Sequence, residues 1–177
     1  FFTSPCDHSR ICSGEARPIF IDSKTLNITT LEDPVEIVLP NINQMSLNNK
    51  LNINFATGLR SILRQDPDVI MIGEIRDEET AAMAVRASIT GHKVYSTIHC
   101  KSAREVYIRL ENMGIKQYLL SDALVGIISQ RLIKTLCDKC KVLDNENSSN
   151  KRTVYKKCGC KDCNYSGYGG RQIISAV

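Results

Sequence analysis

The stretch DPDVIMIGEIRDEETAAMAVRASITGHKVYST, residues 66–97, predicts the fold of this chain. After Asp66–Asp68, the apolar run Val69–Ile72 leads through a glycine to Glu74. A helical segment follows, and then a second strand that is expected to end at His99. Strand, helix and strand in this order predict a parallel α/β unit. Open α/β sheets bind ligands at the carboxyl ends of their strands. A glutamate there can orient or deprotonate the water that attacks a γ-phosphate, so this stretch alone indicates an α/β protein and allows a nucleotide hydrolase.

Further elements are predicted on both sides of this stretch. The β-branched run Asn27–Glu32 predicts a strand that leads to an acid pair, and two prolines then mark a loop. Asn54 is suited to cap a helix from Phe55 to about Gln65. Asp77 is suited to cap the next helix, whose first-turn acids favour the helix dipole. Val94–Ile98 is the following predicted strand.

The carboxyl-terminal half is predicted to be helical before it becomes rich in cysteine. Ser102 and Glu105 have the spacing of a capping box, which predicts a helix from Ser102 to Met113 that Gly114 closes. A second helix from Ser121 to about Leu136 is predicted from apolar residues at helical spacing: Leu124, Ile127, Ile128 and Leu132. The polar stretch DNENSSN, residues 144–150, is expected to be a loop.

Length and composition allow one ordinary domain and a small appendage, because the 177 residues are 42% hydrophobic and 24% charged. No run of 18 apolar residues and no signal peptide is found, so we expect no membrane-spanning segment. The opening Phe-Phe without Met suggests a fragment. The net charge of +4 is uneven, since residues 131–177 hold ten Lys and Arg against four acids. This surplus indicates either a solvated face or a patch for an acidic partner or anionic lipid.

Five of the eight cysteines lie close together near the carboxyl terminus. Cys137-x-x-Cys140 and Cys160-x-x-Cys163 are separated by 19 residues, which is typical of a tetrathiolate zinc site. Four thiolates leave no open coordination position, so the predicted zinc is structural and contributes on the order of 10 kcal/mol to folding. Disulfides and inert thiols are the alternatives, and disulfides are disfavoured because no secretory signal is present. Cys158 is a further thiol that could compete as a ligand.

Several motifs in a fixed order resemble one known family. They are LEDPVE at Leu31–Glu36, LRSILRQDPDVIMIGEIRD at Leu59–Asp77, TGHKVYSTIH at Thr90–His99 and the paired CxxC module. They resemble the Asp box, Walker B region, His box and zinc module of the ATPases that drive type II secretion and type IV pilus assembly, a branch of the secretion NTPase superfamily. The resemblance covers roughly Thr29 to Arg171. It implies an α/β fold with a RecA-like P-loop NTPase core, incomplete here, and a small tetracysteine zinc module.

The resemblance assigns catalytic roles to acids at the predicted strand ends. Glu74 is the expected catalytic glutamate, and Glu32 of the Asp box is expected near the metal and the attacking water, beside Asp33. Gly73 stands where many P-loop enzymes have a magnesium-holding aspartate, so other oxygens must hold Mg²⁺. The alternatives are structural: Glu74 as a cap or as the partner of Arg76, and Asp33 as part of an Asp-Pro turn.

Arginines and histidines near these acids are expected to contact the phosphates of a nucleotide. Arg60, Arg64 and Arg76 can stabilise the charge that develops on a transferred phosphoryl group, with ordinary salt bridges as the alternative. His92 and His99 match the His box, where a histidine can hydrogen-bond the γ-phosphate and sense its loss. A satisfied structural histidine is the alternative. The Cys-Lys-Ser that follows His99 departs from the Thr-Asn-Asp run of the family.

A phosphate-binding loop of the form G-x-x-x-x-G-K-[S/T] is not found in the sequence. The spacing of the family places it at residues 4–12, where SPCDHSRIC stands. Pro5 fits the family pattern, but Arg10 occupies the lysine position, Ile11 the hydroxyl position, and no glycine is present. Arg10 can still attract phosphate, whereas a tight anion-binding nest requires glycine. We interpret this segment as a decayed phosphate loop or unrelated sequence, and expect ATP turnover far below that of the family.

The predicted organisation has four parts, which are a degraded or replaced P-loop region (1–26), a RecA-like ATPase core (27–136), a zinc-binding module (137–171) and a truncated C-terminal tail (172–177). The resemblance implies ATP with Mg²⁺ and structural Zn²⁺ as cofactors. It implies a homo-hexamer or mixed ring in the cytoplasm, peripheral at the inner face of the cytoplasmic membrane. The implied partner is an inner-membrane platform protein of a secretion or pilus machine. The zinc module favours the assembly and secretion branch over the pilus-retraction branch.

Two other functions are compatible with the sequence. A non-catalytic remnant could join rings as an inactive subunit or act only through protein contacts. A zinc ribbon that binds nucleic acid is disfavoured, because aromatic residues suited to base stacking are few apart from Tyr155, Tyr165 and Tyr168. No nucleic-acid partner is therefore expected.

Overall fold

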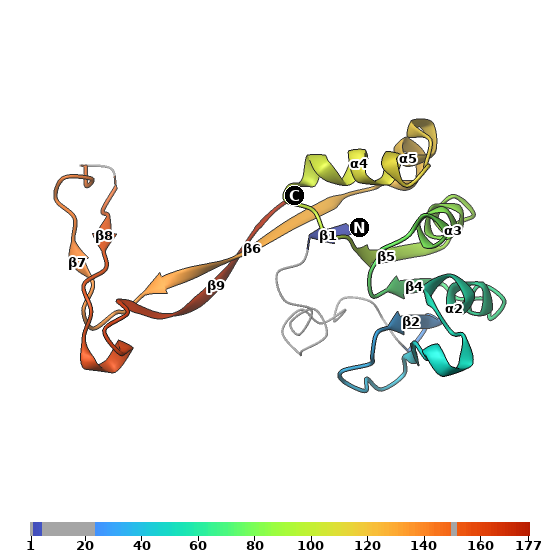
Figure 1. The fold of residues 1–177 in the computed structure, drawn as a ribbon, viewed down its shortest axis with the longest axis horizontal. Helices are drawn as coiled ribbons and strands as arrows, with labels where there is room; N and C mark the ends of the chain where they lie inside the picture. Colours follow the sequence, from blue (N-terminus) through green and yellow to red (C-terminus); the bar gives the residue numbers. More distant parts are fainter. Residues whose placement is uncertain (1, 5–23, 150–151) are drawn as a thin grey trace. The chain divides into compact units, whose positions relative to one another are not determined.

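The computed structural model describes residues 2–4, 24–149 and 152–177, and the chain divides into two compact units. Unit 1 comprises Phe1–Ser129 with Ala176–Val177, and unit 2 comprises Gln130–Ser175. Figure 1 draws the ribbon of both units, coloured along the sequence.

Unit 1 is built on a parallel sheet. Its strands are β1 (Phe2–Ser4), β2 (Ile28–Glu32), β3 (Asn43–Ser46), β4 (Val69–Ile72), β5 (Lys93–Thr97) and the first residues of β6 (Ile127–Leu136). They lie in the order β3-β2-β4-β5-β1-β6, and the pairs that involve β1 to β5 and the start of β6 are parallel. The predicted α/β class with a parallel sheet is therefore confirmed. β3, which immediately adjoins the Asp-box strand, was not predicted.

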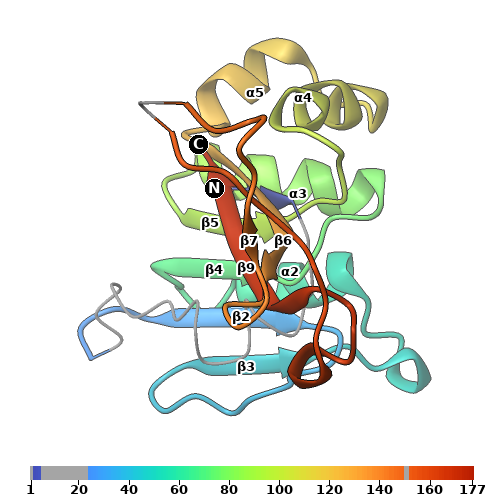
Figure 2. The same ribbon diagram turned by 90° about the vertical axis from the view of Figure 1, so that its left-hand side faces the viewer.

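Helical segments connect these strands. They are the 3₁₀ turn η1 (Asn49–Leu51) and the helices α2 (Phe55–Ile62), α3 (Glu78–Ile89), α4 (Ala103–Asn112) and α5 (Gln117–Ala123). Of these, α2 and α3 cover one face of the sheet. In Figures 1 and 2, α2 and α3 lie side by side along β2, β4 and β5, in agreement with their contacts. The core fills the space between these helices and the sheet. Its fully buried members include Leu31, Ile70 and Ile72 from strands and Leu59 and Ile62 from α2.

The two predicted Asx caps are confirmed. The Asn54 side chain accepts a hydrogen bond from the Thr57 amide at 2.8 Å, and the Thr57 hydroxyl accepts one from the Asn54 amide at 2.9 Å. Asp77 accepts a hydrogen bond from the Thr80 amide at 2.8 Å. These side chains satisfy amides that the first helical turn leaves without intrahelical partners. α2 ends at Ile62, earlier than the predicted end at Gln65.

The predicted helix from Ser121 to Leu136 is wrong. α5 ends at Ala123, and β6 then runs from Ile127 to Leu136. β6 pairs with β1 in parallel, so its first backbone groups bond to a strand rather than within a helix. The β-branched residues of β6 favour a strand, whereas the helical spacing of the apolar residues led to the prediction of a helix.

The predicted capping box at Ser102 is also wrong, although the helix it was expected to open is present as α4. Ser102 precedes α4 without a side-chain cap hydrogen bond. The Glu105 carboxylate instead accepts a hydrogen bond from the Lys101 amide at 2.9 Å. β5 ends at Thr97, so His99 lies just beyond the strand rather than at its last residue.

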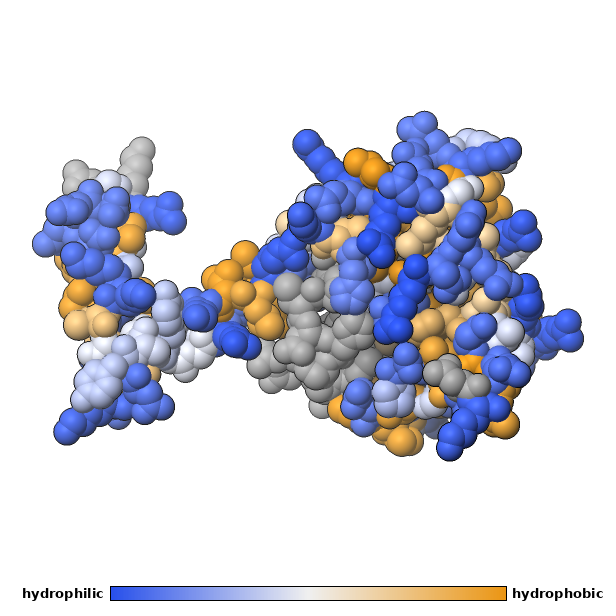
Figure 3. Space-filling view, viewed as in Figure 1, coloured by the Kyte–Doolittle hydropathy of each residue, from blue (hydrophilic) through white to orange (hydrophobic). Residues whose placement is uncertain are grey.

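Unit 2 has little regular structure beyond paired strands. The rest of β6 neighbours β9 (Tyr168–Ala176), and β7 (Val142–Leu143) pairs with β8 (Tyr155–Lys156) in an antiparallel hairpin. A 3₁₀ turn, η2 (Lys161–Cys163), precedes β9. The face of this unit visible in Figure 3 is mostly hydrophilic. Among the described residues of this unit, Cys137 is the one buried hydrophobic residue, so the unit has little apolar core and requires another source of stability.

Candidate functional site

The strands of unit 1 are parallel, so their carboxyl ends lie at one edge of the sheet, where open α/β sheets bind ligands. The residues that follow β5, and those that follow β4 beside it, therefore border the expected site. The predicted phosphate-loop segment begins at Ser4, the end of β1, but residues 5–12, including Arg10, lie outside the described residues.

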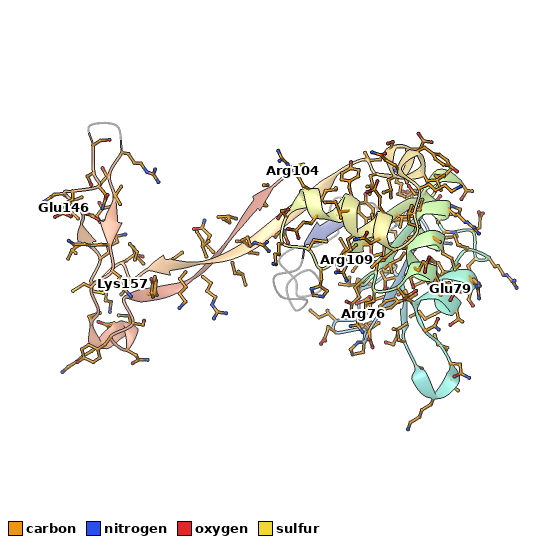
Figure 4. The ribbon with its side chains drawn as sticks, turned by 45° about the horizontal axis from the view of Figure 1, so that its top comes forward. Arg76, Glu79, Arg104, Arg109, Glu146 and Lys157 are labelled. Atoms are coloured by element: carbon orange, nitrogen blue, oxygen red, sulfur yellow. The ribbon has the colours of Figure 1, made fainter. Side chains whose placement is uncertain are left out.

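Glu74 is a buried acid that lies between the side chains of Arg76 and His99. Its side chain is 4% exposed, and one carboxylate oxygen forms an ion pair with Arg76 Nη2. The other oxygen, Oε2, lies 3.5 Å from His99 Nε2. Arg76 Nη1 also lies 3.7 Å from Asp33 Oδ2. The hydrogen bond with Glu74 raises the pKa of Arg76, and this guanidinium (labelled in Figure 4) contacts both Asp33 and Glu74 as a cation.

The backbone around Glu74 is held by both neighbouring strands. The Gly73 amide donates a hydrogen bond to Leu31 O at 2.7 Å, on the β2 side. On the β5 side, the Thr97 hydroxyl donates to Gly73 O at 2.6 Å, and the Ile75 amide donates to Thr97 O at 2.9 Å. A Cβ at position 73 would lie 3.1 Å from Leu31 O. An aspartate at this position would therefore displace the strand that carries the Asp box, which gives a physical reason for the glycine.

Glu32 is the second buried acid of the site and the last residue of β2. Its Oε1 accepts hydrogen bonds from the Thr30 hydroxyl at 2.5 Å and from Gln44 Nε2 at 3.0 Å. Thr30 and Gln44 are opposite each other in the β2–β3 register. The sequence analysis missed both partners. The i,i+2 spacing of Thr30 and Glu32 on one strand face was an available signal, whereas Gln44 required knowledge of β3.

The structure does not bring every predicted phosphate-contacting residue to these acids. Arg60 forms an ion pair with Glu79, and both side chains are more than half exposed. Arg64 is exposed and follows α2, on the approach to the start of β4. His92 precedes β5, where its Nδ1 lies 3.1 Å from Ala87 O. Because the strands are parallel, Arg64 and His92 lie toward their amino ends, whereas Glu74, Arg76 and His99 follow carboxyl ends.

The four predicted zinc ligands come together in unit 2. The thiol sulfurs of Cys137, Cys140, Cys160 and Cys163 all lie within 4.8 Å of one another. Two of these separations, Cys140–Cys163 and Cys160–Cys163, are 3.8 Å. Four sulfurs placed tetrahedrally at about 2.3 Å from a zinc ion would be about 3.8 Å apart. The donor set and its spacing therefore fit zinc, and Cys158 is exposed and is not one of the four.

The backbone around the cluster favours bound thiolate. Cys163 Sγ accepts hydrogen bonds from the Cys160 amide at 3.2 Å and the Gly167 amide at 3.3 Å. These amides lower the pKa of Cys163 to about 6. Withdrawal from water raises the pKa of Cys140 to about 12, and the adjacent thiols act in the same direction. A cation at the centre would favour the thiolate form of all four, which is the state that binds metal.

Lysines cover the rings of two tyrosines in unit 2. Lys134 Nζ lies 5.1 Å and Lys157 Nζ 5.6 Å from the centre of the Tyr168 ring, and Lys141 Nζ lies 5.4 Å from that of Tyr155. Lys157 is labelled in Figure 4. These ammonium groups occupy ring faces that base stacking would need, so the arrangement gives no support to a nucleic-acid-binding role.

Comparison with known proteins identifies the class. The sequence model of the family "Type II/IV secretion system protein" matches residues 17–177, and the chain belongs to this family. The family resemblance read from the motifs is thus confirmed. Type II secretion system protein E of Dickeya dadantii is 49% identical over 162 residues, which cover 87% of this chain and 32% of that protein. Type II secretion system ATPase E of Vibrio cholerae is 47% identical over 164 residues, which cover 87% and 33%. The chain spans about a third of the length of these curated relatives.

Solved structures share the fold. The pilus retraction motor PilT with bound ADP is similar with a TM-score of 0.57 and 35% identity, over 73% of this chain and 37% of that one. The ATPase DotB of Legionella pneumophila gives a TM-score of 0.61 and 26% identity, over 88% and 42%. Within the residues described here, no helix has the length and apolar character needed to cross a membrane.

Proposed function

We propose that this chain is the C-terminal ATPase portion of a type II secretion or type IV pilus assembly motor, which binds and hydrolyses ATP to power secretion or pilus assembly. The observation that carries the proposal is the pair of buried acids, Glu32 and Glu74, at the carboxyl ends of adjacent parallel strands in a chain of this family. Arg76 links the two acidic motifs by its contacts with Glu74 and Asp33.

In this proposal each side chain has one task. Glu74 orients the attacking water and accepts its proton, and Glu32 with Asp33 holds Mg²⁺ through carboxylate oxygens. Arg76 and His99, which contact Glu74 in this structure, turn to the phosphate oxygens when a triphosphate is present. Mg²⁺-ATP supplies the phosphoryl group that is transferred. Arg60, Arg64 and His92 act on phosphates only from a neighbouring subunit, since they lie away from these acids within one chain.

The zinc module has a structural role in this proposal. Cys137, Cys140, Cys160 and Cys163 hold Zn²⁺ and thereby fold a unit that has little apolar core. The proposed assembly is a homo-hexamer or mixed ring at the cytoplasmic face of the inner membrane, which transmits motion to a membrane platform protein. This part of the proposal rests on the family and on relatives named for type II secretion.

We further propose that turnover by this chain is far below that of its relatives. The segment SPCDHSRIC, which begins where β1 ends, contains neither the glycines nor the lysine of a phosphate loop. This sequence favours a second candidate function, an inactive ring subunit that acts through protein contacts. Doping the chain into an active motor tests this candidate, because it inhibits turnover only if its subunit interfaces are competent.

The principal test is calorimetric titration of the zinc-loaded chain with Mg²⁺-ATP, followed by turnover assays. Micromolar affinity with slow hydrolysis that Glu74→Gln abolishes would support the proposal. Glu111→Gln is the matched control, because Glu111 is an exposed glutamate on α4 and its replacement should change neither quantity. Absence of binding heat from a folded chain would refute ATP hydrolysis by this chain and leave the inactive-subunit function. Turnover equal to that of an intact motor would refute the impairment.

A further inference from the structure

The side-chain amide of Gln44 makes hydrogen bonds to three residues. Its Nε2 donates to Glu32 Oε1 at 3.0 Å and to Ile37 O at 3.1 Å, and its Oε1 accepts from the Leu39 amide at 2.6 Å. A backbone amide can only donate and a carbonyl can only accept, so these two backbone groups fix which end of the Gln44 amide is oxygen. The NH₂ group must therefore face Glu32.

This orientation connects the buried acid to an exposed loop. The loop, residues 35–40, leaves the Asp box and returns to β3, and its Val38 is 86% exposed. Gln44 joins the loop at Ile37 and Leu39, and Ser46 joins it separately by accepting a hydrogen bond from the Val35 amide at 3.1 Å. Gln44 also donates to the Glu32 carboxylate, whereas Ser46 lies opposite Glu32 in the β2–β3 register. Movement of the loop at Leu39 must therefore either break its hydrogen bond with Gln44 or shift Gln44 and the Glu32 carboxylate that Gln44 orients.

We propose that Gln44 is a positioning residue that holds the Glu32 carboxylate in place and couples it to the conformation of loop 35–40. The inference deepens the proposed function, because Glu32 is the residue assigned there to the metal and the attacking water. Thr30 supports the same carboxylate oxygen from within β2 but has no contact with the loop among the hydrogen bonds described above. Gln44 thus adds a connection that Thr30 does not provide.

The variant Gln44→Glu keeps the size of this side chain and its acceptor for the Leu39 amide, but it removes the donors to Glu32 and to Ile37 O. Two carboxylates would then meet in a partly buried setting, which is unfavourable. The swap Glu32→Gln/Gln44→Glu restores one amide and one acid at this contact. Ser46→Ala is the matched control, since it releases the other loop anchor and keeps the hydrogen bonds from Thr30 and Gln44 to the Glu32 carboxylate.

The experiment measures thermal unfolding, amide hydrogen exchange and Mg²⁺-ATP turnover of the zinc-loaded chain. Gln44→Glu should lower Tm by at least about 4 °C, on the scale for chains of this size, and the swap should recover at least about half of the loss. Exchange at the Leu39 amide should remain protected in Gln44→Glu and accelerate at least about tenfold in Gln44→Leu, which removes the acceptor. Ser46→Ala should accelerate exchange at Val35 and not at Leu39.

Turnover then tests the positioning role. Gln44→Glu should lower kcat at least about tenfold with KM within about threefold, whereas Ser46→Ala should stay within about twofold of the parent chain. Equal kcat in Gln44→Glu and the parent would overturn positioning, and a swap that fails to recover Tm would overturn the contact itself. A parent chain that binds no Mg²⁺-ATP would refute the proposed function, while the Tm and exchange results would still decide whether Gln44 holds Glu32 to the loop.

Discussion

Replacing Gly73 with alanine should shift the backbone that carries both buried acids. An added Cβ would lie 3.1 Å from Leu31 O, 3.5 Å from Glu32 Cα and 3.6 Å from Phe55 Cε1. The two nearest neighbours are backbone atoms of the buried strand β2, which cannot rotate away as the tip of a side chain can. The strand must therefore move by a few tenths of an ångström, and the hydrogen bond from the Gly73 amide to Leu31 O must adjust with it.

The size of the effect follows from two opposing contributions. Overpacking of a well-filled interior costs about 1–3 kcal/mol. The change from Gly to Ala also restricts the unfolded chain, which favours the folded state by about 0.4–1 kcal/mol where the conformation is allowed. The steric cost is the larger, so Gly73→Ala should destabilise unit 1 by about 1 kcal/mol. For a chain of this size that corresponds to a fall in Tm of about 3 °C.

The assay is urea unfolding of the zinc-loaded chain, with calorimetric Mg²⁺-ATP titration of the same samples. Gly170→Ala in β9 is the control, because the added Cβ would lie 3.4 Å from Thr135 Oγ1, an ordinary contact. The free energy of unfolding of this variant should differ from that of the parent by less than about 0.5 kcal/mol. Gly73→Asp should be at least as destabilising as Gly73→Ala and should not strengthen Mg²⁺ binding. A Gly73→Ala chain as stable as its parent would refute the close approach of β4 to β2 described here.

Three further outcomes follow from individual contacts. Asn54→Ala removes the cap of α2 and should lower the free energy of unfolding by about 1 kcal/mol in urea, and an effect below about 0.3 kcal/mol would contradict the capping box. Arg76→Gln should cost about 1–2 kcal/mol because its carboxylate partner is buried, whereas Arg60→Gln, in an exposed pair, should cost less than about 0.5 kcal/mol; equal costs would contradict this difference. Immediately after a chelator removes zinc at pH 7, before unit 2 unfolds, iodoacetamide should modify Cys163 before Cys140, because in the folded unit the pKa of Cys163 is lowered to about 6 and that of Cys140 is raised to about 12. Mass spectrometry reads this order, and its reversal would contradict the role of the amide donors.

The sequence predicted the parts of the fold that local chemistry determines. Asn54 and Asp77 are caps because their side chains accept bonds from amides a few residues away, which spacing alone can predict. The apolar run Val69–Ile72 is a buried strand because it pairs on both sides within the sheet. The thiols of Cys137, Cys140, Cys160 and Cys163 likewise lie close together, as their spacing in the sequence predicted.

Two of the wrong or missing predictions depended on contacts between distant segments, and a third on a local hydrogen bond. Ile127 and Ile128 have helical spacing with Leu124, but their pairing with β1 makes them part of a strand, and no local pattern reveals that partner. Gln44 was missed for the same reason, since its significance comes from lying beside Thr30 across β2 and β3. At Ser102, the nearby Glu105 carboxylate bonds to the Lys101 amide, so the spacing of a capping box was present without its bonding.

Several contacts of the acids in the candidate site come from residues distant in sequence from the segment in which the phosphate loop is expected. Glu74 contacts Arg76 and His99, and Glu32 contacts Thr30 and Gln44, all between residues 30 and 99. Because residues 4–12 contain neither the glycines nor the lysine of a phosphate loop, we expect weaker attachment of the triphosphate, whereas the side chains proposed to act on Mg²⁺ and water are present. Nucleotide affinity measures the first property, and the effect of Glu74→Gln on residual turnover measures the second. Weak Mg²⁺-ATP affinity with turnover that depends on Glu74 would mean that only binding of the phosphates is impaired. Normal affinity without such turnover would mean that the acids are no longer arranged for hydrolysis.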